Sequence, residues 1–193
     1  MVGAIAFLGR EIAVLQPETD LERAIISDDR WKVGARWGKP RPGHPEGKIE
    51  AHIGEVLANL ERLGLDPTSR RKLRLVALVH DTFKGEVDRA RPRSGDNDHA
   101  LIARRFVERY TDDEDVLEIT ELHDEAYRSW SIGSRRGDWA RAEVRARRLL
   151  ERLGPRRDLY LAFYRADNAA GDKRAEPLVW FESLLQRQRR LVP

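Results

Sequence analysis

Four histidines and two aspartates follow one another along the chain in an order that could build a metal site. They are His52, His80, Asp81, His99, His123 and Asp167. Neutral imidazole binds borderline divalent metals such as Mn, Fe, Co, Ni and Zn, and a carboxylate adds negative charge and a hard oxygen ligand. A metal-centred hydrolase is therefore the leading interpretation, with one or two divalent transition metal ions as cofactor.

Helical periodicity surrounds the first of these residues. Apolar positions recur at helical spacing over residues 49–63, where they form a stripe beside His52, and Gly64 is a natural stop signal. A second helix is expected from Asp66-Pro67, which carries capping signals, through an apolar run to His80-Asp81. Adjacent helical side chains point about 100° apart, so this pair converges on one ion most easily where the helix ends.

The later part of the chain also predicts helices, and no run alternates with the period of a strand, so the fold class is all-α. Residues 90–98 are expected to form a loop over or beside the site, and Asp98 could cap a helix over residues 99–110. A further helix over residues 112–127 would carry His123, and residues 132–137 are expected to form a loop. The remaining helices are expected near residues 138–153, 155–169 and 177–191.

Composition limits the function less than the histidines do. The 193 residues include 36 Lys and Arg against 33 Asp and Glu, so the net charge of +3 does not by itself indicate nucleic acid. The charged run over residues 141–152 is interpreted as a solvated helix face. No cysteine is present, which excludes thiolate metal ligands and disulfides. The apolar start, residues 1–8, is too short to cross a membrane and lacks the features of a secretory signal, so a cytoplasmic protein is expected.

The order His52, His80-Asp81, then the distant Asp167 resembles the signature of the HD-domain superfamily of metal-dependent phosphohydrolases. The resemblance covers residues 44–172, about two thirds of the chain. It implies a single helical bundle over residues 41–193, and residues 1–40 are then expected to be an N-terminal helical extension packed on that body. Within this extension, Trp31 and Trp37 are expected to pack on the body, with a wall of the active site as the alternative.

The resemblance also implies roles for the site residues. The first metal would be bound by His52, His80, Asp81 and Asp167. His99 and His123 match the positions that add a second metal in dinuclear members, which favours two ions. Asp81 could bridge them, and Lys84, which follows it by three residues as in many members, would hold a phosphate oxygen and stabilise charge in the transition state. These two residues are the candidate catalytic groups, and a surface position is the alternative for Lys84.

A second, local resemblance bears on the substrate. Residues 42–47, Pro-Gly-His-Pro-Glu-Gly, followed five residues later by His52, are similar to the opening of the HD domain attached to some bacterial tRNA nucleotidyltransferases. This favours a small phosphorylated substrate, a nucleotide above all, although the same residues could form a simple turn before a helix.

Two other functions fit the same residues. The six ligands also resemble those of the HD-fold mixed-valent diiron oxygenases, and ligand type alone does not separate a hydrolase from an oxygenase. A non-catalytic HD module that binds a nucleotide is the third interpretation. A homodimer is compatible with the chain, although no pattern supports it specifically.

Overall fold

The computed structural model describes residues 15–191, and their regular structure is helical apart from one isolated bridge between Arg41 and His44. The prediction of an all-α fold is confirmed. The α-helices are α1 (Asp20–Ser27), α2 (Asp29–Ala35), α3 (Ile49–Glu61), α4 (Pro67–Val79), α5 (His99–Val107), α6 (Glu114–Leu122), α7 (Glu125–Arg136), α8 (Trp139–Leu153), α9 (Arg157–Asn168) and α10 (Glu176–Leu191). Short 3-10 turns lie at Lys84–Glu86, Gly95–Asn97 and Gly154–Arg156.

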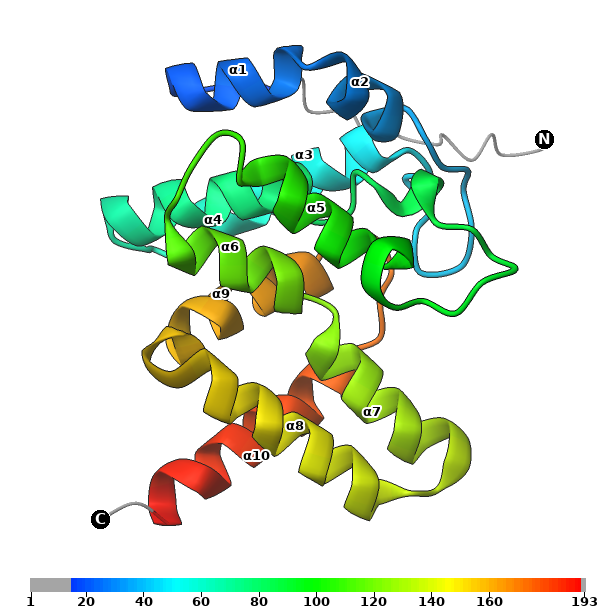
Figure 1. Ribbon diagram of the computed structural model, residues 1–193. Coiled ribbons are helices and arrows are strands. Elements are labelled where there is room, and N and C mark those ends of the chain that lie inside the picture. The colour runs from blue at the N-terminus through cyan, green and yellow to red at the C-terminus, as the bar shows by residue number, and fades with distance from the viewer. Residues whose placement is uncertain (1–14, 192–193) are drawn as a thin grey trace, which may run out of the picture.

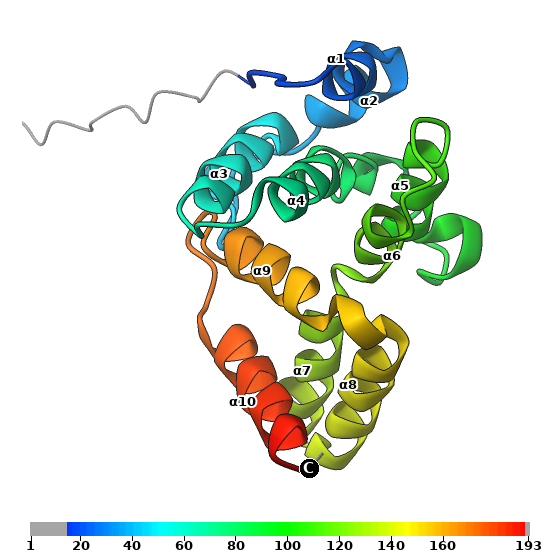
Figure 2. The same cartoon turned by 90° about the vertical axis from the view of Figure 1, so that its left-hand side faces the viewer.

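The helices form two groups that α9 connects (Figures 1 and 2). In one group, α3 and α4 lie side by side, α9 packs against both, and α5 and α6 cover α4 from the other side. In the other group, α7 packs against α8 and α10. Because α6 belongs to the first group and α7 to the second, the chain passes between the groups at residues 123–124.

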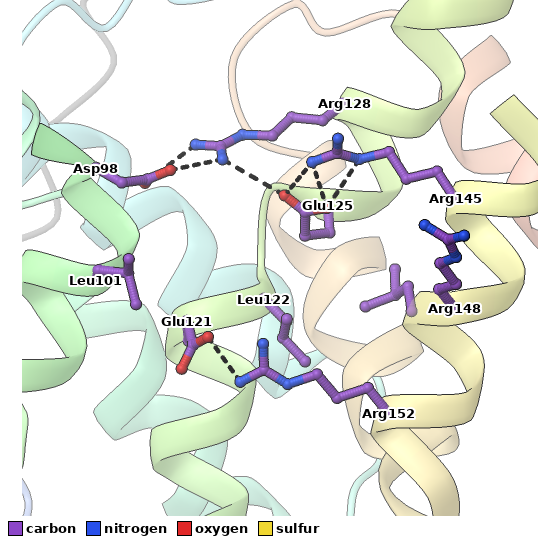
Figure 3. A pocket seen from close by; sticks show the side chains of 10 residues that line it. Asp98, Leu101, Glu121, Leu122, Glu125, Arg128, Arg145, Arg148 and Arg152 are labelled. Carbon is purple, nitrogen blue, oxygen red and sulfur yellow. Dashed lines mark hydrogen bonds and ion pairs between the residues drawn. The ribbon is translucent and has the colours of Figure 1, made fainter. Parts of the chain in front are cut away.

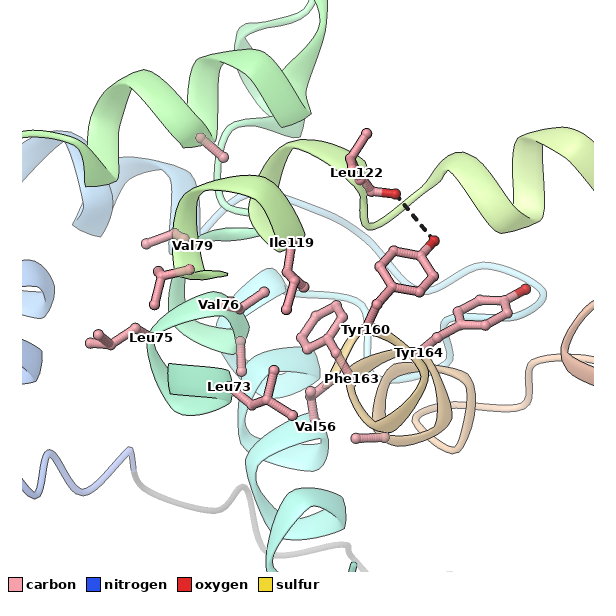
Figure 4. Close-up of a cluster of buried hydrophobic side chains, with 14 of the residues drawn as sticks. Val56, Leu73, Leu75, Val76, Val79, Ile119, Leu122, Tyr160, Phe163 and Tyr164 are labelled. Carbon is pink, nitrogen blue, oxygen red and sulfur yellow. Dashed lines mark hydrogen bonds between the residues drawn. The ribbon is translucent and has the colours of Figure 1, made fainter. Parts of the chain in front are cut away.

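The main core forms where α3, α4, α6 and α9 meet (Figure 4). Val56, Leu73, Val76 and Ile119 are fully buried there, as the helical spacing of apolar residues predicts. Tyr160 of α9 is also fully buried, and its hydroxyl group lies 3.2 Å from the carbonyl oxygens of residues 122 and 123. The core therefore holds the end of α6 in place.

Most expected helix ends are confirmed within one or two residues, including the start of α4. The Asp66 side chain caps that helix by accepting hydrogen bonds from Thr68 N and Ser69 N, at 2.9 and 3.0 Å. The helix ends at Val79, so His80 and Asp81 stand at its end as the side-chain geometry requires. Asp98 caps α5 through Ala100 N, as predicted.

Two expectations for residues 112–137 are wrong. The single helix over residues 112–127 is two helices, because the chain leaves the helical path at residues 123–124, where Tyr160 bonds the backbone. The expected loop over residues 132–137 is the last part of α7. Gly133 of this helix allows close packing, since a Cβ atom there would lie 2.2 Å from the Trp139 ring. Gly137, with φ of 71°, ends the helix.

Helices α1 and α2 lie on the α3–α4 layer (Figure 1). Trp31 is buried and donates from Nε1 to the carbonyl oxygen of Leu78, at 2.8 Å. The buried Arg74 side chain pairs with Glu22 at 2.8 Å. Trp31 thus packs on the body as expected, whereas the boundary at residue 40 stays a prediction and the apolar start at residues 1–8 lies outside the described residues. No helix among residues 15–191 is both long and apolar enough to cross a bilayer.

Candidate metal centre

The six predicted ligands lie close together within the group formed by α3, α4, α5, α6 and α9. His52 lies in α3, and Asp167 lies in the last turn of α9. The other histidines stand at helix ends: His80 follows α4, His99 begins α5 and His123 follows α6. All four imidazoles are at least 96% buried.

One half of the site contains the first predicted set. His52 Nε2 lies 3.0 Å from Asp167 Oδ1 and 3.3 Å from His80 Nε2. Asp81 Oδ2 lies 3.7 Å from His52 Nε2 and 3.6 Å from His80 Nε2. His52, His80 and Asp81 are close enough to contribute one ligand atom each to a common ion. Asp167 borders this group through its contacts with the two imidazoles.

The other half uses the second oxygen of the same aspartate. Asp81 Oδ1 lies 3.6 Å from His99 Nε2 and 3.4 Å from His123 Nε2, and the two imidazole nitrogens are 3.2 Å apart. Asp124 Oδ2 lies 3.4 Å from His99 Nε2. The two oxygens of Asp81 therefore face two separate groups of predicted ligands, so Asp81 could contribute one oxygen to each of two ions.

The hydrogen bonds of the imidazoles orient the rings so that they can bind a cation. His80 Nδ1 lies 3.0 Å from the carbonyl oxygen of Ala77, and His123 Nδ1 lies 2.8 Å from that of Thr120. A carbonyl oxygen only accepts, so each Nδ1 carries the hydrogen and each Nε2 turns a lone pair toward the site. Asp81 Oδ1 is buried and has no hydrogen-bond partner among the described residues. A divalent cation would satisfy these converging acceptors.

Two lysines compensate the charge of the buried carboxylates. Burial alone would raise the pKa of Asp81, but Lys84, whose Nζ lies 2.5 Å from Oδ2, and the neighbouring imidazoles together outweigh it and hold the pKa well below its usual range. Burial would also raise the pKa of Asp167, but Lys173 at 2.7 Å together with His52 and His80 outweighs it, so this pKa is lowered as well. Both carboxylates are therefore ionised at neutral pH, as metal ligands must be.

The histidines differ in their protonation. Burial lowers the pKa of His80 and of His99, which favours the neutral form that binds metals. Burial has the same effect on His52, but Asp167 and Glu46 outweigh it and raise the pKa. A metal ion at His52 would therefore have to displace a proton, so its binding should weaken as the pH falls.

Glu46 is a part of the site to which the sequence analysis gave no role. Its carboxylate is 96% buried, and Oε1 lies 2.9 Å from His44 Nδ1 and 3.1 Å from His52 Nδ1. A carboxylate behind an imidazole orients the ring and fixes which nitrogen faces the metal. From the sequence, residues 44–46 indicate only a phosphorylated substrate or a turn. The spacing of six residues between Glu46 and His52 does not reveal their contact.

A cavity of about 870 Å³ opens onto the metal centre. Lys84, Asp124 and Lys173 line it together with Asp81, His99, His123 and Asp167. Trp37 also lines it, so this tryptophan forms a wall of the site, the alternative that the sequence left open. A pocket of this size accommodates a nucleotide-sized ligand.

A second cavity, of about 350 Å³, lies between α5, α6, α7 and α8 (Figure 3). Most charged side chains of its lining form ion pairs with one another. Arg128 pairs with Asp98 at 2.7 Å, and Arg145 pairs with Glu125 at 2.6 Å. The cavity contains none of the six predicted ligands.

Buried histidines and aspartates that converge at the bottom of a pocket in an all-α fold define a candidate metalloprotein. The sequence model of the HD domain family matches residues 49–162, more than half of the chain, and the chain therefore belongs to the HD domain family. Members of this family are usually metal-dependent hydrolases that bind divalent ions. No curated protein and no solved structure gives a significant match. Asp167 lies beyond the matched residues, and the fold brings it to His52.

Proposed function

We propose that this protein is a metal-dependent phosphohydrolase that acts on a nucleotide or a similar small phosphate ester. The observation that carries the proposal is the position of Asp81. Its two oxygens face two groups of imidazoles, and Lys84 contacts it from the pocket side. Metal binding by the six residues and the catalytic roles of Lys84 and Asp81 are parts of this proposal.

The proposed reaction adds water to phosphorus and breaks the ester P–O bond, so that the products are inorganic phosphate or a phosphomonoester and an alcohol. Divalent ions at such a centre acidify water and stabilise negative charge on phosphate oxygens. The Lys84 ammonium group, which lines the pocket, can hold a phosphate oxygen as charge develops. Asp124 also lines the pocket and can accept a hydrogen bond from the attacking water, which orients it.

A nucleotide is favoured by the lining of the cavity. Trp37, Tyr127 and Trp130 offer aromatic surface on which a base can stack, and the volume of about 870 Å³ far exceeds what a phosphate group alone would fill. The rings of Tyr127 and Trp130 lie 6.0 Å apart at the pocket.

Phosphate release tests the proposal. The protein, reconstituted separately with Mn, Fe, Co, Ni or Zn, is incubated with nucleoside monophosphates and cyclic nucleotides, with Asp81→Asn as the matched variant. We expect the wild type to form inorganic phosphate from monophosphates, or the ring-opened monophosphate from cyclic nucleotides, in a metal-dependent way, and we expect neither product from the variant. Turnover that requires dioxygen and iron would instead identify an oxygenase, and binding without turnover under every condition would identify a binding module. Either result would refute the proposal.

A further inference from the structure

The large cavity is lined by five arginines that come from four separate segments. They are Arg41, Arg89, Arg93, Arg135 and Arg174. All five are exposed, and none forms an ion pair with another residue in the described part of the chain. The two lysines at the metal end differ from them, since Lys84 pairs with Asp81 and Lys173 with Asp167.

Such a group of cations favours an anionic ligand. Seven cationic side chains line the cavity against four carboxylates, and three of these carboxylates lie at the metal end, where bound ions would neutralise them. The cavity therefore carries a surplus of positive charge, which attracts anions. Guanidinium groups bind phosphate in bidentate geometry.

A second observation points to a ligand in the same cavity. Tyr164 is 96% buried, it lines the cavity, and its hydroxyl group has no hydrogen-bond partner among the described residues. In Figure 4 the Tyr164 ring lies beside that of Tyr160, but only the Tyr160 hydroxyl group makes a contact, with the carbonyl oxygen of Leu122. A buried hydroxyl group without a partner is unfavourable, and a bound ligand with an acceptor oxygen would satisfy it.

We propose that the substrate is a nucleotide with at least two phosphate groups, and that the five arginines bind a phosphate other than the one that is hydrolysed. This inference rests on the proposed function, which assigns the reacting phosphate to the metal end near Lys84. Water adds to the terminal phosphate at the metal end and the P–O bond to its bridging oxygen breaks, so that the products are inorganic phosphate and a nucleotide with one phosphate fewer. The phosphate that stays on the nucleotide is the one that the unpaired guanidinium groups bind. The arginines determine which substrates bind and take no part in bond breaking.

Binding of a non-hydrolysable nucleotide tests this directly. The probe is adenosine 5′-(α,β-methylene)diphosphate, compared with adenosine 5′-monophosphate by calorimetric titration of the metal-loaded protein. We expect the wild type to bind the diphosphate analogue at least about tenfold more tightly, as expected for charge-assisted hydrogen bonds. In the double variant Arg89→Gln, Arg93→Gln this preference should fall to about twofold or less, while monophosphate binding changes little.

The control is the double variant Arg71→Gln, Arg105→Gln, which makes the same charge change at two exposed arginines outside the cavity. It should keep the preference of the wild type. Equal affinity of the wild type for both nucleotides, or an unchanged preference in the Arg89 and Arg93 variant, would overturn the inference. So would tight, arginine-dependent binding of a single-stranded oligonucleotide without preference for the diphosphate. Arginine-dependent diphosphate binding without phosphate release would contradict only the proposed function.

Discussion

The two cavities of this protein are both lined by arginines, but the arginines are used differently. In the smaller cavity, three of the four lining arginines, Arg128, Arg145 and Arg152, are each paired with a carboxylate that lines the same cavity, and only Arg148 has no ion pair among the described residues (Figure 3). In the larger cavity, the five arginines have no ion-pair partner among the described residues. Paired charges hold helices together, whereas unpaired charges beside a candidate metal centre are available to a ligand.

The smaller cavity nevertheless supports the larger one. Asp98, which pairs with Arg128, also caps the helix that begins with His99. Arg128 in turn lies 3.7 Å from Asp124, next to the second group of predicted ligands. The ion pairs between α5 and α7 therefore contribute to the position of two residues of the site.

The largest effect is expected on turnover, when Lys84 of the larger cavity is removed. In Lys84→Ala the predicted ligands remain, so metal content should stay near that of the wild type. The turnover number should fall about a hundredfold or more, because charge on the phosphate is no longer stabilised. Elemental analysis and steady-state kinetics measure the two effects. Lys48→Ala, an exposed lysine outside the cavity, serves as the control and should behave like the wild type.

Loss of Glu46 should weaken metal binding without removing a ligand. In Glu46→Ala the His52 ring loses the carboxylate that orients it, and the affinity for metal should fall about 10- to 100-fold. Competition with a chromophoric chelator measures this affinity. Glu50→Ala removes a carboxylate from the first turn of the same helix, and an equal loss of affinity in that variant would argue against a specific role for Glu46.

In the smaller cavity, charge removal should change stability rather than chemistry. Asp98→Asn keeps a capping side chain but removes the charge closest to Arg128, which retains only its longer contacts with Glu125 and Asp124, so the free energy of unfolding at pH 7 should fall by about 2 kcal/mol. Metal content should not change. Urea unfolding monitored by circular dichroism measures the loss, and depleted metal would show that this pair belongs functionally to the site.

The same pair predicts a pH dependence. Burial would raise the pKa of Asp98, but the Arg128 guanidinium outweighs it and lowers the pKa in the folded state. Asp98 therefore contributes stability above its unfolded pKa of about 4, and this contribution is lost as the pH falls through the lower folded value. The acid decrease in unfolding free energy should be smaller in Asp98→Asn than in the wild type.

The smallest effect is expected for the exposed ion pair at the edge of the smaller cavity. Arg152 pairs with Glu121 at 2.6 Å, but its side chain is 45% exposed. In Arg152→Gln the unfolding free energy should change by less than about 1 kcal/mol, and phosphate release should not change. A loss as large as that in Asp98→Asn would mean that exposure does not explain the difference between the pairs.

The sequence predicted what local periodicity controls. The spacing of apolar residues located α3, α4 and α8 within a few residues, and the order of histidines and aspartates identified six side chains that the fold brings together. It did not predict the break between α6 and α7, because the cause is the hydroxyl group of Tyr160, which is distant in the chain. Glu46 and Lys173 were missed for the same reason, since each contacts a site residue that is distant in the chain or on another element. The five arginines were missed because only the fold gathers them around one cavity.

The most direct test of the account is the metal content of the purified protein. Wild-type protein and Asp81→Ala, prepared without added metal or chelator, are compared by elemental analysis and electron paramagnetic resonance. The account predicts about two divalent ions per chain in the wild type and almost none in the variant, because Asp81 faces both groups of ligands. Equal metal content in the two proteins, or a wild type that binds no metal even after reconstitution, would contradict it.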